Sequence, residues 1–136
     1  MNHVYESGAF SSQGSRHEQQ DSFLIEPQKG LFAVFDGHDT EGALASSAAA
    51  IEVSELFVGT SLDCVDNLED AFVRIDDLMP YRGGTTATVV GVDKRSDGVN
   101  RVLSYNVGDS PAFLIDPHAD TLNGNAVIEL TTMHTP

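Results

Sequence analysis

Short apolar runs separated by turn residues dominate the first third of the chain. Ser22–Glu26 and Leu31–Asp36 flank a turn at Pro27–Gly30, and this arrangement predicts a β-hairpin. Leu31–Phe35 is continuously apolar, as expected of a strand that is buried on both faces. Val4–Gly8 gives a weaker strand signal. The N-terminal part of the chain is therefore expected to supply strands to a sheet.

Helical patterns follow these strands. Asp39 or Thr40 can cap a first helix that runs to about Phe57 and is rich in alanine and serine, whose small side chains allow close packing on a sheet. Ser61 or Asp63 can cap a second helix. Its apolar residues recur every three or four positions, as on one helix face: Val65, Leu68, Phe72, Ile75 and Met79.

Strand signals return in the second half of the chain. Thr85–Val92 is rich in threonine and valine, and Val99–Val107 and Ala112–Ile115 flank a tight turn. Val127–Leu130 follows an Asn-Gly turn signal. Strands, then helices, then strands again predict an α+β domain with mainly antiparallel sheets. We expect one domain over residues 1–136.

The chain is strongly acidic, with 21 Asp and Glu against 7 Lys and Arg and a formal net charge of −14. This balance argues against nucleic acid as a partner, because phosphate backbones are bound by Lys and Arg. It suits divalent cations or basic protein substrates.

The remaining composition points to the cytoplasm. The single cysteine, Cys64, excludes an internal disulfide. Neither a signal-peptide pattern nor an apolar stretch of membrane-spanning length is present in the sequence, so no membrane association is expected. Leu130–Pro136 stops without a terminal element, which indicates a truncated chain.

Asp36-Gly37-His38 ends the most apolar predicted strand. A carboxylate there reaches a sheet edge, and Gly37 lets a backbone carbonyl approach a ligand closely. Mg²⁺ and Mn²⁺ prefer such oxygen donors. His38 could act as a general acid near neutral pH. The alternative is a plain turn, since Asp-Gly is a common turn dipeptide.

Arg16, Gln20 and Asp21 form a second candidate group. Asp21 opens the strand that should pair with the one ending in Asp36, so a hairpin of this register could bring the two carboxylates together. Arg16 is one of few cations in the chain, and its planar guanidinium suits a phosphate. The alternative is a solvated loop.

Glycine-containing segments complete the set of candidates. Gly83-Gly84-Thr85 leads into a strand, and its paired glycines indicate close backbone approach. Structural tightness is favoured over phosphate binding there, because a phosphate-binding loop would be followed by a helix. Asp109, in the turn before Ser110, can direct a carboxylate at a metal, although a hairpin turn alone would explain it.

Together, these segments resemble the successive motifs of the metal-dependent protein phosphatases of type 2C, the PPM-type phosphatases. The resemblance runs from about Ser7 to the C-terminus. Its Phe-Asp-Gly-His and Val-Gly-Asp-Ser segments are specific when they occur together. The matching stretches are Arg16 with Gln20–Phe23, Phe32–His38, Gly83–Ala87, Asn106–Ser110 and Leu130–Thr131.

The resemblance implies an antiparallel β-sandwich flanked by helices, and hydrolysis of phosphoserine and phosphothreonine in proteins by water activated on two Mg²⁺ or Mn²⁺ ions. By position, Asp36 would bridge both metals and Gly37 would offer its carbonyl. Gln20 and Asp21 would orient metal-bound waters, and Asp109 would help to hold an additional metal.

The resemblance also implies roles outside the metal set. Arg16 would hold the substrate phosphate, and His38 would protonate the leaving oxygen. Gly83, Gly84 and Thr85 would support the site.

This sequence departs from the family pattern in three respects. Asp39 and Thr40 stand where the family usually has glycines, and Pro111, which lacks a backbone N–H, stands where it often has arginine. Family catalytic domains are roughly twice as long, so this chain is expected to be their N-terminal half, without further metal-binding aspartates. The alternative is a catalytically inactive phosphatase-like binding or regulatory module. Uncovered sheet edges are expected to favour self-association.

Overall fold

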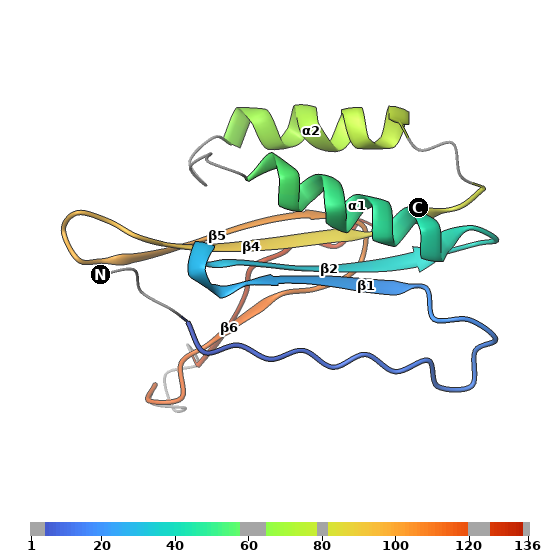
Figure 1. The fold of residues 1–136 in the computed structure, drawn as a ribbon. Coiled ribbons are helices and arrows are strands. Elements are labelled where there is room, and N and C mark those ends of the chain that lie inside the picture. Colours follow the sequence, from blue (N-terminus) through green and yellow to red (C-terminus); the bar gives the residue numbers. More distant parts are fainter. Residues whose placement is uncertain (1–4, 58–64, 79–81, 120–125, 135–136) are drawn as a thin grey trace.

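A computed structural model describes residues 5–57, 65–78, 82–119 and 126–134 of the chain. Helices cover one side of a main antiparallel sheet, and a smaller sheet lies on its other side (Figure 1). This arrangement confirms the expected α+β class with antiparallel sheets. The strands of the main sheet are β1 (Asp21–Glu26), β2 (Leu31–His38), β3 (Gly84–Thr85), β4 (Ala87–Lys94) and β5 (Asn100–Val107).

The predicted hairpin forms between β1 and β2. A 3₁₀ turn, η1 (Pro27–Lys29), joins the strands, and Gly30 follows it with a left-handed φ of 62°. Strand order across the sheet is β1-β2-β4-β5, and β3 pairs with the end of β2. Because Gly37 and His38 pair with β3, β2 continues two residues past the predicted end at Asp36.

The expected strand Thr85–Val92 is divided at Thr86 into β3 and β4. The Asp36 N–H donates to the Thr86 hydroxyl oxygen at 3.0 Å, and the Thr85 hydroxyl donates to the Thr86 carbonyl at 2.8 Å. The Thr86 hydroxyl thus takes the place of a backbone carbonyl as the hydrogen-bond acceptor between β2 and the β3–β4 segment. Residues 5–8 lack regular secondary structure, so the expected strand Val4–Gly8 is not formed in the described part of this segment.

The expectation that Leu31–Phe35 is buried on both faces is wrong. Leu31, Ala33 and Phe35 are buried, but Val34 on the opposite face is 47% exposed. The physical reason is that the helices cover only one face of the sheet. On the other face, the segment after β7 is hydrogen-bonded near β5, where the Ser104 hydroxyl donates to the Leu130 carbonyl at 2.6 Å.

Helix α1 (Gly42–Leu56) packs closely against the sheet, as its small side chains predicted. Its buried positions include Ala45, Ser46, Ala49 and Val53, which share one face. The predicted cap at Asp39 or Thr40 is wrong. Glu41 occupies the N-cap position without a side-chain capping bond.

The carboxylate of Glu41 is engaged elsewhere. It accepts a hydrogen bond from the Arg82 N–H, and the Glu41 N–H donates to the Arg82 carbonyl at 3.0 Å. The start of α1 is therefore attached to the segment that leads into β3. A tertiary contact of this kind moves the helix start beyond the capping residues that local sequence suggested.

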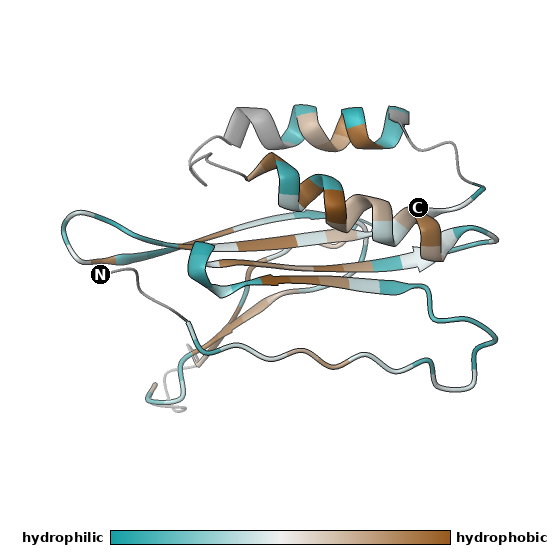
Figure 2. Ribbon diagram, viewed as in Figure 1, coloured by the Kyte–Doolittle hydropathy of each residue, from teal (hydrophilic) through white to brown (hydrophobic). Residues whose placement is uncertain are grey.

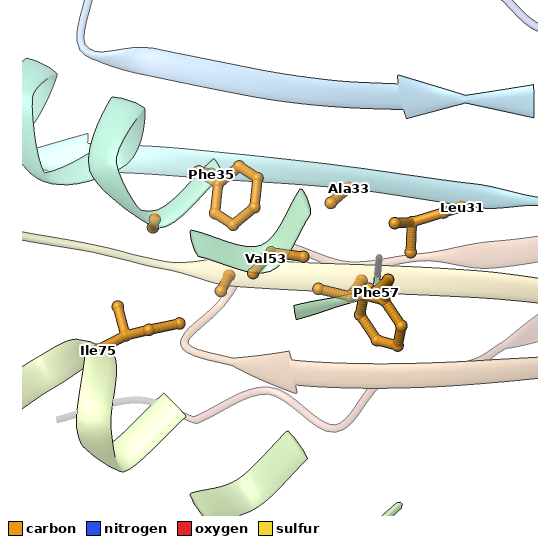
Figure 3. Close-up of a cluster of buried hydrophobic side chains, with 9 residues drawn as sticks. Leu31, Ala33, Phe35, Val53, Phe57 and Ile75 are labelled. Carbon is orange, nitrogen blue, oxygen red and sulfur yellow. The ribbon is translucent and has the colours of Figure 1, made fainter. Parts of the chain in front are cut away.

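The hydrophobic core lies between β2, β4 and the helices. Leu31, Ala33 and Phe35 face Val53 and Phe57 across this layer (Figure 3). Apolar segments run through the central parts of β1, β2 and β4 and through α1 (Figure 2).

Helix α2 (Val65–Leu78) contributes Ala71 and Ile75 to the buried set, with Phe72 packed beside the core. The expected caps Ser61 and Asp63 lie outside the described residues, as do the side chains of Val65, Leu68 and Met79.

Strands β6 (Phe113–Ile115) and β7 (Val127–Glu129) form the second sheet. Their bounds agree with the predicted runs to within a residue. The pairing is extended by the Leu130 N–H, which donates to the Ala112 carbonyl at 2.8 Å. Both strands are exposed. Among the helices of the described residues, none combines the length and apolar character needed to cross a membrane.

Candidate functional site

Carboxylates from adjacent strands meet at one end of the main sheet. Asp21 opens β1 and is the direct cross-strand partner of Asp36 in β2, so the predicted pairing of these residues is confirmed. Although much of Asp36 is open to solvent, partial burial raises the pKa of its carboxyl. A hydrogen bond with Asp21 and the negative charges of Asp21 and Asp109 raise this pKa further, while His38 lowers it. The charges of two neighbouring carboxylates therefore act on Asp36 at this point.

Thr86 fixes the backbone of Asp36 and links it to the turn that carries Asp109. The Thr86 N–H donates to the Asp36 carbonyl at 2.9 Å, complementing the bond from the Asp36 N–H to the Thr86 hydroxyl. The same hydroxyl lies 2.6 Å from that of Ser110. This network connects β2, the β3–β4 junction and the turn after β5.

Gly37 sits where two backbones come unusually close. A Cβ atom on it would lie 2.3 Å from the Gly42 carbonyl oxygen and 2.4 Å from the Gln20 carbonyl oxygen. A Cβ on Gly42 would in turn lie 2.8 Å from the Gly37 carbonyl carbon. The absence of a side chain at Gly37 therefore brings the first residue of α1 against the end of β2, whereas the predicted approach of its carbonyl to a ligand stays a prediction.

Gln20 ties the start of β1 to the loop after β2. Its side-chain amide donates to the Asp39 carbonyl at 2.7 Å. Its own carbonyl accepts from the Gly37 N–H at 3.2 Å and from the Ser46 hydroxyl at 2.6 Å. Gln20 thus holds the site together in this structure through its backbone and its side chain.

His38 and Asp39 form a pair at the edge of the site. Nδ1 of His38 lies 2.9 Å from the Asp39 carboxylate, and both side chains are exposed. Asp39 has a φ of 66°, in the left-handed region that glycine adopts more readily. Asp39 is therefore held in a conformation that a glycine at this position would adopt without strain.

Gly83 and Gly84 make room for His38, which supports the structural interpretation of the paired glycines. A Cβ on Gly84 would lie 2.8 Å from Nε2 of the His38 ring, and a Cβ on Gly83 would lie 2.4 Å from the His38 carbonyl oxygen. Thr85 pairs with Gly37 across the β2–β3 ladder.

An open cavity of about 1020 Å³ joins these features. Residues 12–21 line one side of it, and residues 36–40 line the other. Arg16 belongs to the first segment, where its backbone carbonyl accepts from the Gln13 amide at 2.8 Å. One cavity is therefore lined by Arg16, Asp21, Asp36 and His38. The charge of Asp109 acts on Asp36.

The donor set fits a hard divalent cation in kind. Carboxylate and carbonyl oxygens are what Mg²⁺ and Mn²⁺ prefer, and like-charged carboxylates in contact are relieved by a cation or a proton. Within the described residues, however, no group of three or more His, Cys, Asp and Glu side chains is arranged to hold a metal ion. Water would have to supply much of the coordination.

Sequence patterns missed Thr86 and Ser46 as organisers of the site. Thr86 lies inside a recognised motif, but its hydroxyl becomes informative only once the register places it opposite Asp36. Ser46 looks like an ordinary small helix residue until its bond to Gln20 is seen.

Comparison with known proteins gives one clear relationship among solved structures. No protein-family model and no curated protein matches the sequence. The chain is similar to the crystal structure of the PPM Ser/Thr phosphatase MsPP from Mycobacterium smegmatis in complex with cacodylate. The TM-score is 0.71 at 28% sequence identity, over 96% of this chain and 54% of that chain. The chain thus spans about half the length of its structural relative, which confirms the expectation of an incomplete domain.

Proposed function

We propose that this chain, a partial PPM-type phosphatase domain, contributes a metal- and phosphate-binding half-site to a Mg²⁺- or Mn²⁺-dependent phosphoserine and phosphothreonine protein phosphatase. One observation carries the proposal. Asp21 and Asp36 are direct cross-strand partners, and both line a cavity that Arg16 and His38 also line. Carboxylates suit a cation and a guanidinium suits a phosphate, so a cavity lined by both can take the two together.

Asp36 is the residue that we assign to metal binding, with the Gly37 carbonyl beside it. Asp21 and Gln20 flank it and are assigned to ordering water around the ion, and Asp109 adds negative charge from the next turn. When bound, divalent cations would lower the pKa of a coordinated water and screen the charge of the phosphate. The close Gly37–Gly42 contact and the Thr86 hydrogen bonds position the backbone that carries these groups.

Arg16 and His38 are assigned to the substrate. The Arg16 guanidinium would bind phosphate oxygens, and His38 would donate a proton to the departing serine or threonine oxygen. The Asp39 carboxylate, at 2.9 Å from Nδ1, orients the imidazole so that Nε2 lies toward Gly84. The substrate would be a phosphorylated protein.

The test is calorimetric titration of Mn²⁺ into the wild-type chain and two variants. Asp36→Asn keeps the shape of the side chain but removes its charge, so Mn²⁺ affinity should fall by at least about tenfold. Asp70→Asn, on the exposed surface of α2, is the matched control and should bind as the wild type does. Equal affinities for the two variants would refute the assignment of Asp36.

A further inference from the structure

A second cavity, of about 620 Å³, opens on the other side of His38. It lies where α1 and α2 meet β3 and the adjoining ends of β4 and β5. Its floor is apolar and buried, formed by Ala49, Ile75 and Ala87. Asp76 stands at its wall. The phosphate site proposed above does not use this cavity.

Apolar side chains at the mouth of this cavity are left open to solvent. Val73 on α2 is 58% exposed, and Val107 at the end of β5 is also exposed. Phe72 is half-buried between them and the core. An apolar side chain entering the cavity would remove these surfaces from water, and this burial is favourable.

The two cavities meet at His38, which is bordered by glycine backbone on the side of the second cavity. His38 lines both cavities. Gly83 and Gly84 lie against it on the side of the second cavity, and they present only backbone there. A peptide bound in the first cavity would therefore need to extend only past His38 to reach the second cavity.

The charge near the second cavity favours a basic neighbour for that apolar side chain. The described side chains of α2 include the carboxylates of Glu69, Asp70, Asp76 and Asp77, against the single cation of Arg74. Asp76 lines the cavity itself. A lysine or arginine beside the inserted side chain would meet this negative potential, and the −14 charge of the chain reinforces it.

We propose that this second cavity is a substrate subsite, which binds an aliphatic or aromatic side chain of a phosphoprotein next to a lysine or arginine and near the phosphorylated residue. The inference rests on the proposed function, because it extends the same substrate from the phosphate site. It makes Val73 and Val107 specificity-determining residues.

Fluorescence anisotropy with labelled peptides tests the subsite. The peptides carry a non-hydrolysable phosphonate analogue of phosphoserine, with a Leu-Arg pair moved stepwise along the sequence on either side of it. In a matched set, serine replaces the leucine. With Mg²⁺ present, the best leucine peptide should bind the chain about tenfold more tightly than its serine counterpart.

Val73→Asp and Val107→Asp should each abolish the preference for leucine. Val99→Asp is the matched control, since Val99 is 57% exposed in the β4–β5 hairpin, away from both cavities. It should keep the preference. Thermal unfolding checks that each variant is folded. If one of the two variants does not fold, the other still tests the subsite.

The outcomes separate the two proposals. If no leucine peptide binds more tightly than its serine partner, or if both variants keep the preference, the subsite is refuted while phosphate-dependent binding can persist. If leucine peptides bind through Val73 whether or not the phosphonate and Arg16 are present, the second cavity is a peptide-binding site but the proposed function fails. If Val73→Asp instead converts a dimer to a monomer in light scattering and leaves peptide affinity unchanged, the second cavity binds a second copy of the chain and the inference is overturned.

Discussion

Asp36 stands in surroundings that disfavour its charged form. Partial burial, the hydrogen bond with Asp21, and the charges of Asp21 and Asp109 all act in the same direction on its pKa. Binding sites commonly keep such unfavourable charges. These charges lower the stability of the free protein, and a bound ligand relieves them. The residue therefore links metal affinity to folding stability, and the two effects can be measured separately.

Asp36→Asn should stabilise the chain at neutral pH in the absence of divalent cations. Because its pKa is raised in the folded state, wild-type Asp36 favours folding below its usual pKa. That contribution is lost as the pH rises through the folded-state value. The melting temperature of the variant should exceed that of the wild type near pH 7, with the difference shrinking as the pH falls toward 4.

Thermal unfolding in chelator across this pH range measures the difference, and Asp70→Asn serves as the control. Excess Mg²⁺ should raise the melting temperature of the wild type more than that of Asp36→Asn, because only the wild type keeps the proposed ligand. A lower melting temperature for Asp36→Asn in chelator would mean that its carboxylate stabilises the fold instead.

Backbones come into close contact where β1, β2 and α1 converge. Gly37, Gly42 and the Gln20 carbonyl are in backbone contact there, so the angle at which α1 leaves β2 depends on the absence of side chains. The Ser46 hydroxyl adds a bond from α1 to the Gln20 carbonyl at 2.6 Å. This junction positions the whole loop that carries His38.

Gly37→Ala should be among the most damaging single substitutions in the chain. The added Cβ would meet backbone oxygens at 2.3 and 2.4 Å, which cannot move as a flexible side chain can. We expect a loss of roughly 3 kcal/mol or more in the free energy of unfolding. Gly8→Ala, where nothing lies within 4 Å of the added Cβ, should change it by less than about 0.5 kcal/mol.

Urea denaturation of both variants measures these differences. A Gly37→Ala protein as stable as Gly8→Ala would show that the junction opens without cost. In that case the glycine would be needed only for its carbonyl or its conformation.

Local patterns were sufficient for some elements and insufficient for others. The hairpin around Pro27–Gly30 could be predicted from apolar runs that flank a turn, and the pairing of Asp21 with Asp36 is the one that such a hairpin allows. The start of α1 does not, because Glu41 is drawn to Arg82, a residue far away in sequence. The exposure of Val34 was equally beyond prediction, since an apolar run does not tell which of its faces will be covered.

The same limit applies to the candidate site. Arg16, Asp36 and His38 could be named from motifs, and the structure places them around one cavity. Thr86 and Ser46 could not, because their importance depends on which backbone groups the fold brings opposite them.

At the scale of the whole molecule, one face of the main sheet is incompletely covered. Phe23 and Val34 are direct cross-strand partners on the face away from α1, and both are exposed. Phe113 and Ile115 on β6 and Val127 on β7 are exposed as well. The chain spans 54% of the phosphatase that it resembles. Apolar surface of this extent favours association.

We therefore expect the 136-residue chain to self-associate through the Phe23–Val34 face. Burying this pair between two copies removes apolar surface from water, and β1, as an edge strand, offers unpaired backbone groups beside it. The mass measured by light scattering should rise with concentration from that of a monomer toward that of a dimer or a larger species. Val34→Lys should shift this transition to concentrations at least about tenfold higher, because a lysine at the contact costs well over 1 kcal/mol to bury. Ile51→Lys, at an exposed position on α1, is the control for added charge and should leave the transition where it is. A wild-type chain that stays monomeric at high concentration would show that the exposed apolar residues are too dispersed to bind a second copy.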